Sequence, residues 1–448
     1  MSPRSLIPSG KALEILVNCR QYCLGRVQAI RRMIMPGAEY ADYYQNKVDE
    51  FGRRIRTVAG RPLELADVDM VRNVIPASSD IEKQVSVAAL LAVLALHAGR
   101  HLRSGEAKIA AGDELGGGIF RVFRRTQSIF LQRWPPGKTR PRAEFEEGKT
   151  IEAFYPTICI EPVKAGEFPV RRVTLPSTIE DLFRRLDKGP LRLAVSHLSA
   201  EAAVRGHCPT AACRFILTST GDDAAQLGFL DGVLRRCVDE QVSVLVLPEL
   251  RVTPALLSEI RSFLKAQKPE DLLNGRGLLA VAAGSWHIAD GGHFVNRSEI
   301  LTAHGETLWV HDKLAEYLIT ADNIRRRPEL KTLLGLDDNG GTEGILPGME
   351  IQYCDTPIGR IAVAICAGFF ERSLRELLVA TRANIFLVPA MSHDTEPLVD
   401  CARDLVRTQW AATLAANCGA IAIDGGFIHT PRARHPTFMK AGWAIVDA

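Results

Sequence analysis

The chain has 448 residues, of which 46% are hydrophobic and 24% are charged. These fractions are typical of a soluble globular protein that can bury a sizeable core. The length exceeds that of one ordinary domain, so two domains are the first interpretation.

The net charge of +3 at pH 7 is unevenly distributed along the chain. Residues 1–150 contain 24 Lys and Arg against 16 Asp and Glu, whereas the remainder of the chain is acidic. A basic first third could face nucleic acid or an acidic partner. No run of basic residues dominates it, however, and no nucleic-acid-binding module is recognisable. We therefore favour a solvated, arginine-rich surface over a nucleic-acid partner.

The ten cysteines are scattered, and the first ten residues are polar. This pattern predicts reduced thiols, no export signal and a cytoplasmic protein. The longest apolar run, residues 85–96, is shorter than the ~20 residues of a membrane span, so we expect a buried helix there and no membrane contact. Cys19 and Cys23 lack a matching second pair at zinc-finger spacing. We expect neither a metal nor another cofactor.

Three segments differ in pattern along the chain. Residues 1–133 have a helical period, clearest over 81–103, and predict a mostly helical basic domain of unknown role. Residues 134–190 begin with a loop rich in Pro and Gly and continue with short β-like pieces, which indicates a linker or accessory segment. Over residues 191–448, apolar strands alternate with amphipathic helices and predict an α/β domain.

In this last segment the sequence predicts eight strands and four helices. Strands are expected at 191–195, 242–247, 278–283, 294–301, 307–310, 359–365, 384–388 and 419–423. Helices are expected at 222–241, 254–268, 371–381 and 400–416. The strands at 294–301 and 307–310 should form a hairpin that turns at His304-Gly305.

Reactive side chains stand at the ends of three of these strands. Glu249 follows a buried strand and a proline, Lys313 follows the strand 307–310, and Cys366 ends an apolar strand just before a helix. Each has an ordinary explanation by itself, such as a surface charge or a small buried thiol. Their shared placement in one domain favours a catalytic set instead. The N–H of Ala367 would follow the turn and could point at a developing oxyanion.

These residues and their surroundings resemble the nitrilase (carbon–nitrogen hydrolase) superfamily over about residues 191–448. The runs that carry the resemblance are Leu247–Glu249, His311–Leu314, Leu346–Gly348, Thr356–Cys366, Ala383–Ala390 and 407–423. The resemblance implies a four-layer α-β-β-α sandwich that forms homo-oligomers. It also implies that Cys366 is the nucleophile, Glu249 the base and Lys313 the oxyanion stabiliser.

The chain departs from the family pattern just after the cysteine. Ala367 and Gly368 stand where members usually have an aromatic or acidic residue followed by an acid, and this leaves the substrate class open. Candidates for the substrate pocket are Trp286, Phe369 and Met391, although core packing explains each of them equally well.

The interval between Lys313 and Leu346 is longer than usual. Many members of the family have a second glutamate in this interval. Here that residue is Glu343 or, alternatively, Glu316.

We therefore interpret residues 191–448 as a thiol-dependent hydrolase of non-peptide carbon–nitrogen bonds. The favoured activity is that of an amidase acting on a small amide or nitrile through a Cys-acyl intermediate, and nitrilase or acyltransferase activity stays open. The alternative is a non-catalytic binding or assembly module of a larger regulatory or defence protein, with the basic N-terminal domain as its working part. An open cavity at the Cys366 sulfur would favour catalysis, and a plugged one would favour the alternative.

Overall fold

The computed structural model describes residues 41–56, short segments between 82 and 165, and most of 168–447. The gaps in this last range lie at 187–190, 199–204, 208–213, 220–222, 418–425, 441–442 and at several positions between 372 and 393. The chain divides into two compact units, one of residues 1–125 and 141–164 and the other of residues 126–140 and 165–448. The predicted loop at 134–142, and the helix at 81–103 except for Glu82 and Ser86, fall outside the described residues.

In the first unit the structure describes one helix and a small antiparallel sheet. The helix is α3 (Ala41–Arg56), and the strands are β1 (Glu114–Leu115), β2 (Phe120–Arg124) and β3 (Ile158–Pro162). The first two strands lie in the segment that was expected to be mostly helical. Strand β2 pairs along its whole length with β3, a segment distant in sequence that no local pattern reveals.

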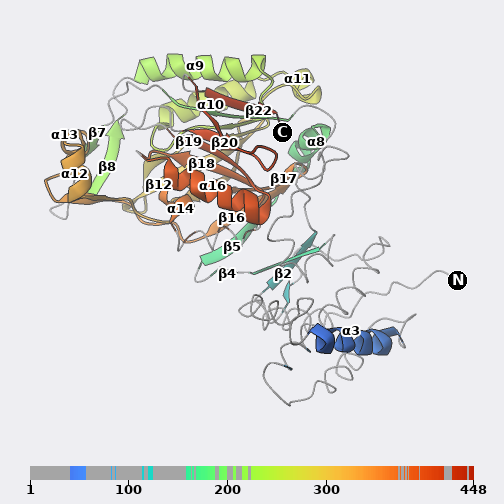
Figure 1. Cartoon of the computed structure of the whole chain (residues 1–448). Coiled ribbons are helices and arrows are strands. Elements are labelled where there is room, and N and C mark those ends of the chain that lie inside the picture. Colours follow the sequence, from blue (N-terminus) through green and yellow to red (C-terminus); the bar gives the residue numbers. More distant parts are fainter. Residues whose placement is uncertain are drawn as a thin grey trace. The chain divides into compact units, whose positions relative to one another are not determined.

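The second unit contains two large mixed sheets (Figure 1). The first has the order β11-β12-β10-β9-β6-β22, with β13 beside β12. Its strands are β6 (Arg192–Ser196), β9 (Val244–Val246), β10 (Ala280–Ala282), β11 (Trp286–Asp290), β12 (His293–Thr302), β13 (Thr307–Asp312) and β22 (Trp443–Asp447). The predicted hairpin is confirmed, because β12 and β13 pair antiparallel.

The second large sheet has the order β21-β20-β19-β18-β17-β16-β5-β4. Its strands are β4 (Lys164–Ala165), β5 (Phe168–Val173), β16 (Ile351–Thr356), β17 (Gly359–Val363), β18 (Ile385–Ala390), β19 (Ala412–Asn417), β20 (Phe427–His429) and β21 (Thr437–Phe438). A smaller third sheet has the order β14-β15-β8-β7, formed by β7 (Arg205–His207), β8 (Arg214–Ser219), β14 (Leu318–Thr320) and β15 (Gly340–Glu343).

Three apolar clusters show how the two large sheets are layered. One cluster joins Val195 of the first sheet to Leu387 of the second, so these sheets pack face to face. The outer face of the first sheet packs on α9 (Asp223–Asp239) and α10 (Pro254–Lys265). The outer face of the second packs on α16 (Glu396–Gln409). Because alternate strand residues point to opposite faces, each central strand can pack against the other sheet on one face and against helices on the opposite face. The α/β prediction is confirmed, and α9 and α16 lie on opposite sides of the stacked sheets (Figure 1).

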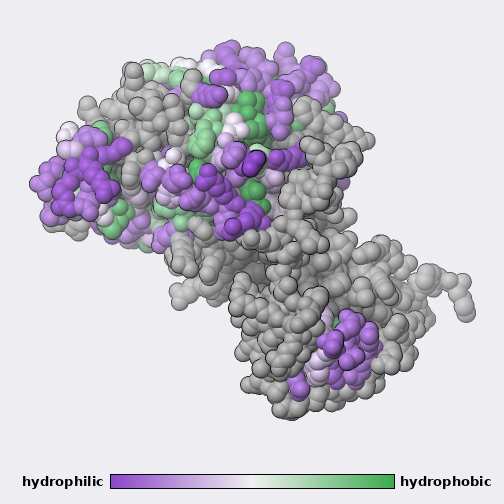
Figure 2. All heavy atoms as spheres, in the orientation of Figure 1, coloured by the Kyte–Doolittle hydropathy of each residue, from purple (hydrophilic) through white to green (hydrophobic). Residues whose placement is uncertain are grey.

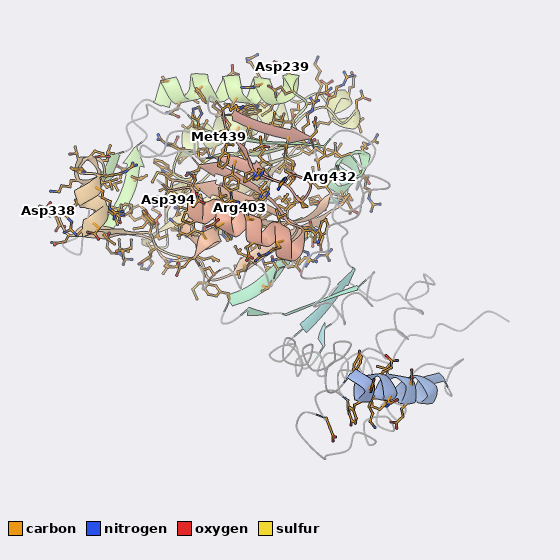
Figure 3. All side chains as sticks on the ribbon, in the orientation of Figure 1. Asp239, Asp338, Asp394, Arg403, Arg432 and Met439 are labelled. Carbon is orange, nitrogen blue, oxygen red and sulfur yellow. The ribbon has the colours of Figure 1, made fainter. Side chains whose placement is uncertain are left out.

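The outer helices are amphipathic. Helix α10 begins with Pro254 after Thr253, whose hydroxyl accepts a hydrogen bond from the Leu256 N–H at 3.4 Å and so caps the helix. Its outward face is polar, as is that of α16, where Arg403 (labelled in Figure 3) pairs with Asp400 at 3.1 Å. Among the described residues, no helix is long and apolar enough to cross a membrane.

Two segments differ from the sequence-based expectation. Residues 134–190 were assigned to a linker or accessory segment, yet β5 pairs in parallel with β16, and α8 (Ser177–Arg185) packs on the core between the sheets. The helix expected over 400–416 ends at Gln409, where Trp410 adopts a φ of 57°, and β19 follows. Alanine favours helices, but the alanines of β19 are buried beside β18, so tertiary pairing overrides their propensity.

Gly305 in the β12–β13 hairpin provides a test of this packing. Its φ is +73°, and a Cβ there would lie 2.6 Å from the Arg261 carbonyl oxygen. Gly291, between β11 and β12, has a φ of +58° and open space around it. We expect Gly305→Ala to destabilise the fold by more than the ~1 kcal/mol that left-handed backbone alone costs in Gly291→Ala. Urea unfolding of both variants measures the difference, and equal midpoints would contradict the close contact.

Candidate active site

The four candidate catalytic side chains come from strand ends in all three sheets of the second unit. Glu249 follows β9, Lys313 follows β13, Cys366 follows β17, and Glu343 is the last residue of β15. All four line one cavity of about 110 Å³. The sequence placed them at separate strand ends, and the fold brings those ends together.

The backbone at Cys366 is held in a strained conformation. Its φ is 44° and its ψ is −109°, values that residues other than glycine rarely adopt. The Cys366 N–H donates to the Pro389 carbonyl at 2.9 Å, and the Cys366 carbonyl accepts from the Phe369 N–H at 2.9 Å. The residue therefore sits at a fixed strand-to-helix turn, the kind of backbone that presents a nucleophile.

Helix α14 (Ala367–Phe370) starts directly after this turn. The first N–H groups of a helix have no acceptor within the helix. The N–H of Ala367 therefore lies at the start of this helix, next to the residue that carries the sulfur.

Lys313 lies between the two glutamates. Its Nζ donates to Glu249 Oε1 at 2.8 Å and to Glu343 Oε2 at 2.6 Å. The side chains of all three are almost fully buried, with exposed fractions of 2% or less. Buried charges are tolerated only when paired and hydrogen-bonded, and one ammonium here serves two carboxylates.

Asn296 of β12 joins the same two carboxylates from the other side. Its Nδ2 donates to Glu249 Oε1 at 2.9 Å and to Glu343 Oε1 at 2.8 Å, which uses both amide hydrogens. The N–H of Met391 donates to Glu249 Oε2 at 2.9 Å. Each carboxylate is thus held in one orientation by three or more donors, because Glu343 also accepts from the Tyr317 N–H at 3.1 Å.

His287 of β11 completes the shell around Glu343. Its Nδ1 accepts from the Leu217 N–H at 2.7 Å, and its Nε2 lies 2.9 Å from Glu343 Oε1. A backbone N–H can only donate, so Nδ1 carries no proton and the neutral ring carries its proton on Nε2. The ring therefore donates to Glu343, and β8 sets its tautomer.

The buried charges shift one another's pKa values. Burial disfavours both the ammonium of Lys313 and the carboxylate of Glu343, but their mutual attraction outweighs it. Lys313 is accordingly held cationic, with its pKa raised by Glu249, Glu343 and Cys366. Lys313 and His287 lower the pKa of Glu343 to about 2.

The thiol experiences the opposite balance. Burial raises the pKa of Cys366, Glu249 raises it further, and Lys313 only partly offsets the two. The Cys366 thiol is therefore protonated at neutral pH. Because Glu249 hydrogen-bonds the thiol, this carboxylate is positioned to accept the thiol proton.

The three candidates for the substrate pocket differ in whether they line the cavity. Met391 lines the cavity. Trp286 does not line it and packs in an apolar cluster with Phe215 and Leu250, and Phe369 packs in the core with its ring 6.0 Å from that of Phe386. For these two, core packing is the explanation that holds.

Of the two glutamates considered for the long interval, Glu343 contacts Lys313 and Glu316 does not. Glu316 pairs with Arg214, away from the buried carboxylates. The difference follows from position, because β15 ends inside the site whereas Glu316 stays partly exposed.

Sequence reasoning missed Asn296, His287 and Tyr317. Asn296 and His287 lie within strands and carried no strand-end signal, although a polar amide inside the β12 pattern is unusual enough to be noticed. The Tyr317 ring lies 5.7 Å from Lys313 Nζ and lines the cavity. Burial and the neighbouring thiol raise its pKa to about 12, so the phenol stays protonated. Among the described residues, no cluster has the composition of a metal site.

Alkylation of Cys366 tests this charge balance. Removing the Glu249 charge with Glu249→Gln should lower the pKa of the thiol and accelerate its reaction with iodoacetamide near pH 8. Glu343→Gln should have a smaller effect, because Glu343 contacts Lys313 and not the sulfur. Peptide mass spectrometry at Cys366 over pH 6–10 gives the rates. An unchanged rate profile in Glu249→Gln would show that the Glu249 carboxylate does not affect the pKa of the Cys366 thiol.

No family model and no curated protein matches the sequence. Among solved structures, 58% of this chain matches 90% of an amidase from Nesterenkonia sp., with 17% identity and a TM-score of 0.39. A variant of the Nesterenkonia sp. AN1 amidase in complex with butyramide matches with 16% identity, the same coverage of both chains and a TM-score of 0.39. The C. elegans NitFhit protein matches over 61% of its length, with 16% identity and a TM-score of 0.40. In this comparison, part of the chain is similar to amidases of the nitrilase superfamily.

Proposed function

We propose that the second unit is a thiol amidase of the nitrilase type that hydrolyses a small amide through a Cys366 thioester. The observation that carries the proposal is the convergence of Glu249, Lys313 and Cys366 on one cavity, with Glu343 behind Lys313. A structural ion pair alone would not need a thiol at a strained turn beside it.

In the first half of the reaction, the Cys366 sulfur attacks the amide carbon while its proton passes to Glu249. The carbonyl oxygen gains negative charge, which the Lys313 ammonium and the Ala367 N–H stabilise. The carbon–nitrogen bond then breaks. The nitrogen leaves as ammonia with the proton held by Glu249, and an acyl thioester stays on the sulfur.

In the second half, Glu249 takes a proton from a water molecule that attacks the thioester. The carbon–sulfur bond breaks, the acid leaves, and the proton returns from Glu249 to the sulfur. Glu343 does not need to exchange protons in either half. Its low pKa and four donors suit it to keep Lys313 charged and aimed at the oxyanion.

The non-catalytic alternative would be favoured by a plugged site. Cys366 itself lines the cavity together with Glu249 and Lys313, so small molecules have space next to the sulfur. A cavity that reaches a nucleophile and its charged neighbours supports chemistry over a purely structural role.

Replacing the nucleophile tests the thiol mechanism directly. Cys366→Ala should lose turnover on short amides while keeping the fold, because only the sulfur atom is removed. Intact mass should show an acyl adduct on the parent protein during incubation with an amide and nitrile library, and none on Cys366→Ala. Cys354→Ala, at another buried thiol in β16, is the matched control and should retain both signals. Turnover in Cys366→Ala would exclude the mechanism.

Lys313 should contribute both to the rate and to the fold. Lys313→Met should reduce kcat by about 10²–10³, the scale of one oxyanion donor. It should also destabilise the fold by ~3–5 kcal/mol, because two buried carboxylates lose their counter-charge.

A double variant separates the two effects of Lys313. Lys313→Met with Glu343→Gln removes one of the unpaired charges, so stability should largely return while kcat stays low. Urea unfolding and steady-state kinetics on the same preparations give the comparison. Recovery of kcat together with stability would mean that Lys313 acts through structure alone.

A further inference from the structure

The end of β18 contacts both Glu249 and Cys366. Three consecutive residues make these contacts, each through its backbone. The Pro389 carbonyl accepts from the Cys366 N–H at 2.9 Å, and the Ala390 carbonyl accepts from the Glu249 N–H at 3.4 Å. The Met391 N–H donates to Glu249 Oε2 at 2.9 Å and also hydrogen-bonds the Cys366 sulfur. The placement of the carboxylate relative to the thiol therefore depends on this short stretch of backbone.

Strand pairing fixes only part of this stretch. Strand β18 pairs in parallel with β19, and the two strands lie side by side (Figure 1). The last pair of their ladder joins Ala390 to Asn417. Met391, whose N–H is shared by the carboxylate and the sulfur, comes one position after this last pair. Its backbone needs a further support to stay in place.

The side chain of Asn417 provides this support. Its Oδ1 accepts from the Ser392 N–H at 2.7 Å, and its Nδ2 donates to the Ser392 carbonyl at 2.9 Å. An amide side chain has an acceptor and a donor at the same end, so it can pair with both backbone groups of one residue as a neighbouring strand would. Met391 is thus held between a ladder pair on one side and this side-chain pair on the other.

Asn417 lies apart from the cavity and away from solvent. It is not among the described residues that line the cavity. Asn417 and Ser392 are both buried, whereas the outward face of α16, the next helix after Ser392, is hydrophilic (Figure 2). Figure 3 labels Asp394 in the loop that leads into this helix. Removing the Asn417 amide would leave two buried backbone groups of Ser392 without their partner, so the loop would have to shift.

We propose that Asn417 is a positioning residue for the proton transfer between Cys366 and Glu249. By fixing the Met391 peptide, it holds the carboxylate at the sulfur, although its own hydrogen bonds go to Ser392. Its effect on turnover rests on the proposed amidase function, whereas its effect on the thiol requires only the contacts described above. Without the Asn417 amide, Glu249 would oppose the thiolate less and would accept the thiol proton less readily.

A double-variant comparison in the full-length protein tests this role without turnover. Glu249→Gln is expected to accelerate the alkylation of Cys366 by iodoacetamide near pH 8, because it removes a charge that opposes the thiolate. In Asn417→Leu the carboxylate is no longer held at the sulfur. The acceleration by Glu249→Gln should therefore be at least about threefold smaller in Asn417→Leu than in the parent protein. Because this acceleration is a ratio of rates within one background, a general change in access to the thiol cancels.

Thr381→Val is the matched control. Thr381 is fully buried before the opposite end of β18, and its hydroxyl donates to the Leu378 carbonyl at 2.6 Å and accepts from the Ala383 N–H at 3.2 Å. Its replacement also removes two buried hydrogen bonds to backbone, so urea unfolding should show a loss of stability, but the acceleration by Glu249→Gln should stay at the parent value.

Asn417→Ser serves as a milder variant if Asn417→Leu does not fold. Its hydroxyl can keep one of the two hydrogen bonds to Ser392, so the acceleration by Glu249→Gln should decrease by a smaller factor than in Asn417→Leu. An acceleration that is equal in the parent protein and in the folded Asn417 variants would overturn the proposal. An equal decrease in Thr381→Val would overturn it as well, because the effect would then be one of stability alone.

Steady-state kinetics on a short amide distinguish this proposal from the proposed function. Asn417→Leu should lower kcat at least about tenfold with little change in KM, because it displaces the reacting groups and not the cavity wall. Thr381→Val should keep the parent kcat. A parent protein without turnover, in which the acceleration still depends on Asn417, would exclude the amidase function and leave the positioning role. A parent protein with turnover and an unchanged kcat in Asn417→Leu would do the reverse.

Discussion

The buried Lys313 ammonium is the interaction on which the site depends. It is the only positive charge among the described buried side chains that line the cavity, and it faces two carboxylates at 2.8 and 2.6 Å. Such an arrangement would be unfavourable without further donors, since each carboxylate has been removed from water. Asn296, His287 and backbone N–H groups provide these donors, so the elements that carry them must meet at one point.

This requirement connects the chemistry to the architecture. The two large sheets supply Glu249, Lys313 and Cys366, and the small third sheet supplies Glu343. The third sheet also orients His287, because the Leu217 N–H in β8 donates to the His287 ring. Through this ring it contributes to the charge balance around Glu343, although it is separate from both large sheets. Residues of the same small sheet and of the helices that follow β14 also line the cavity.

The protonation state of the thiol follows from the same charges. One ammonium cannot compensate two carboxylates and a thiolate together, and burial adds to the cost of a third negative charge. The raised pKa of Cys366 expresses this balance. In the proposed reaction, the thiol would lose its proton only as it attacks, and the Glu249 carboxylate would accept that proton.

Local sequence patterns were enough to predict an α/β unit and to locate Glu249, Lys313 and Cys366, because buried strands are continuous apolar runs and a polar residue at their end stands out. They could not place β5 in a sheet, because a β-like piece does not reveal its partner strand β16. They predicted helix over most of β19, because its alanines favour helices and only pairing with β18 makes it a strand. They also missed Asn296 and His287, whose importance comes from contacts with a glutamate far along the chain. Charge balance among residues distant in sequence is a property of tertiary structure alone, and it decided that Glu343 and not Glu316 supports the lysine.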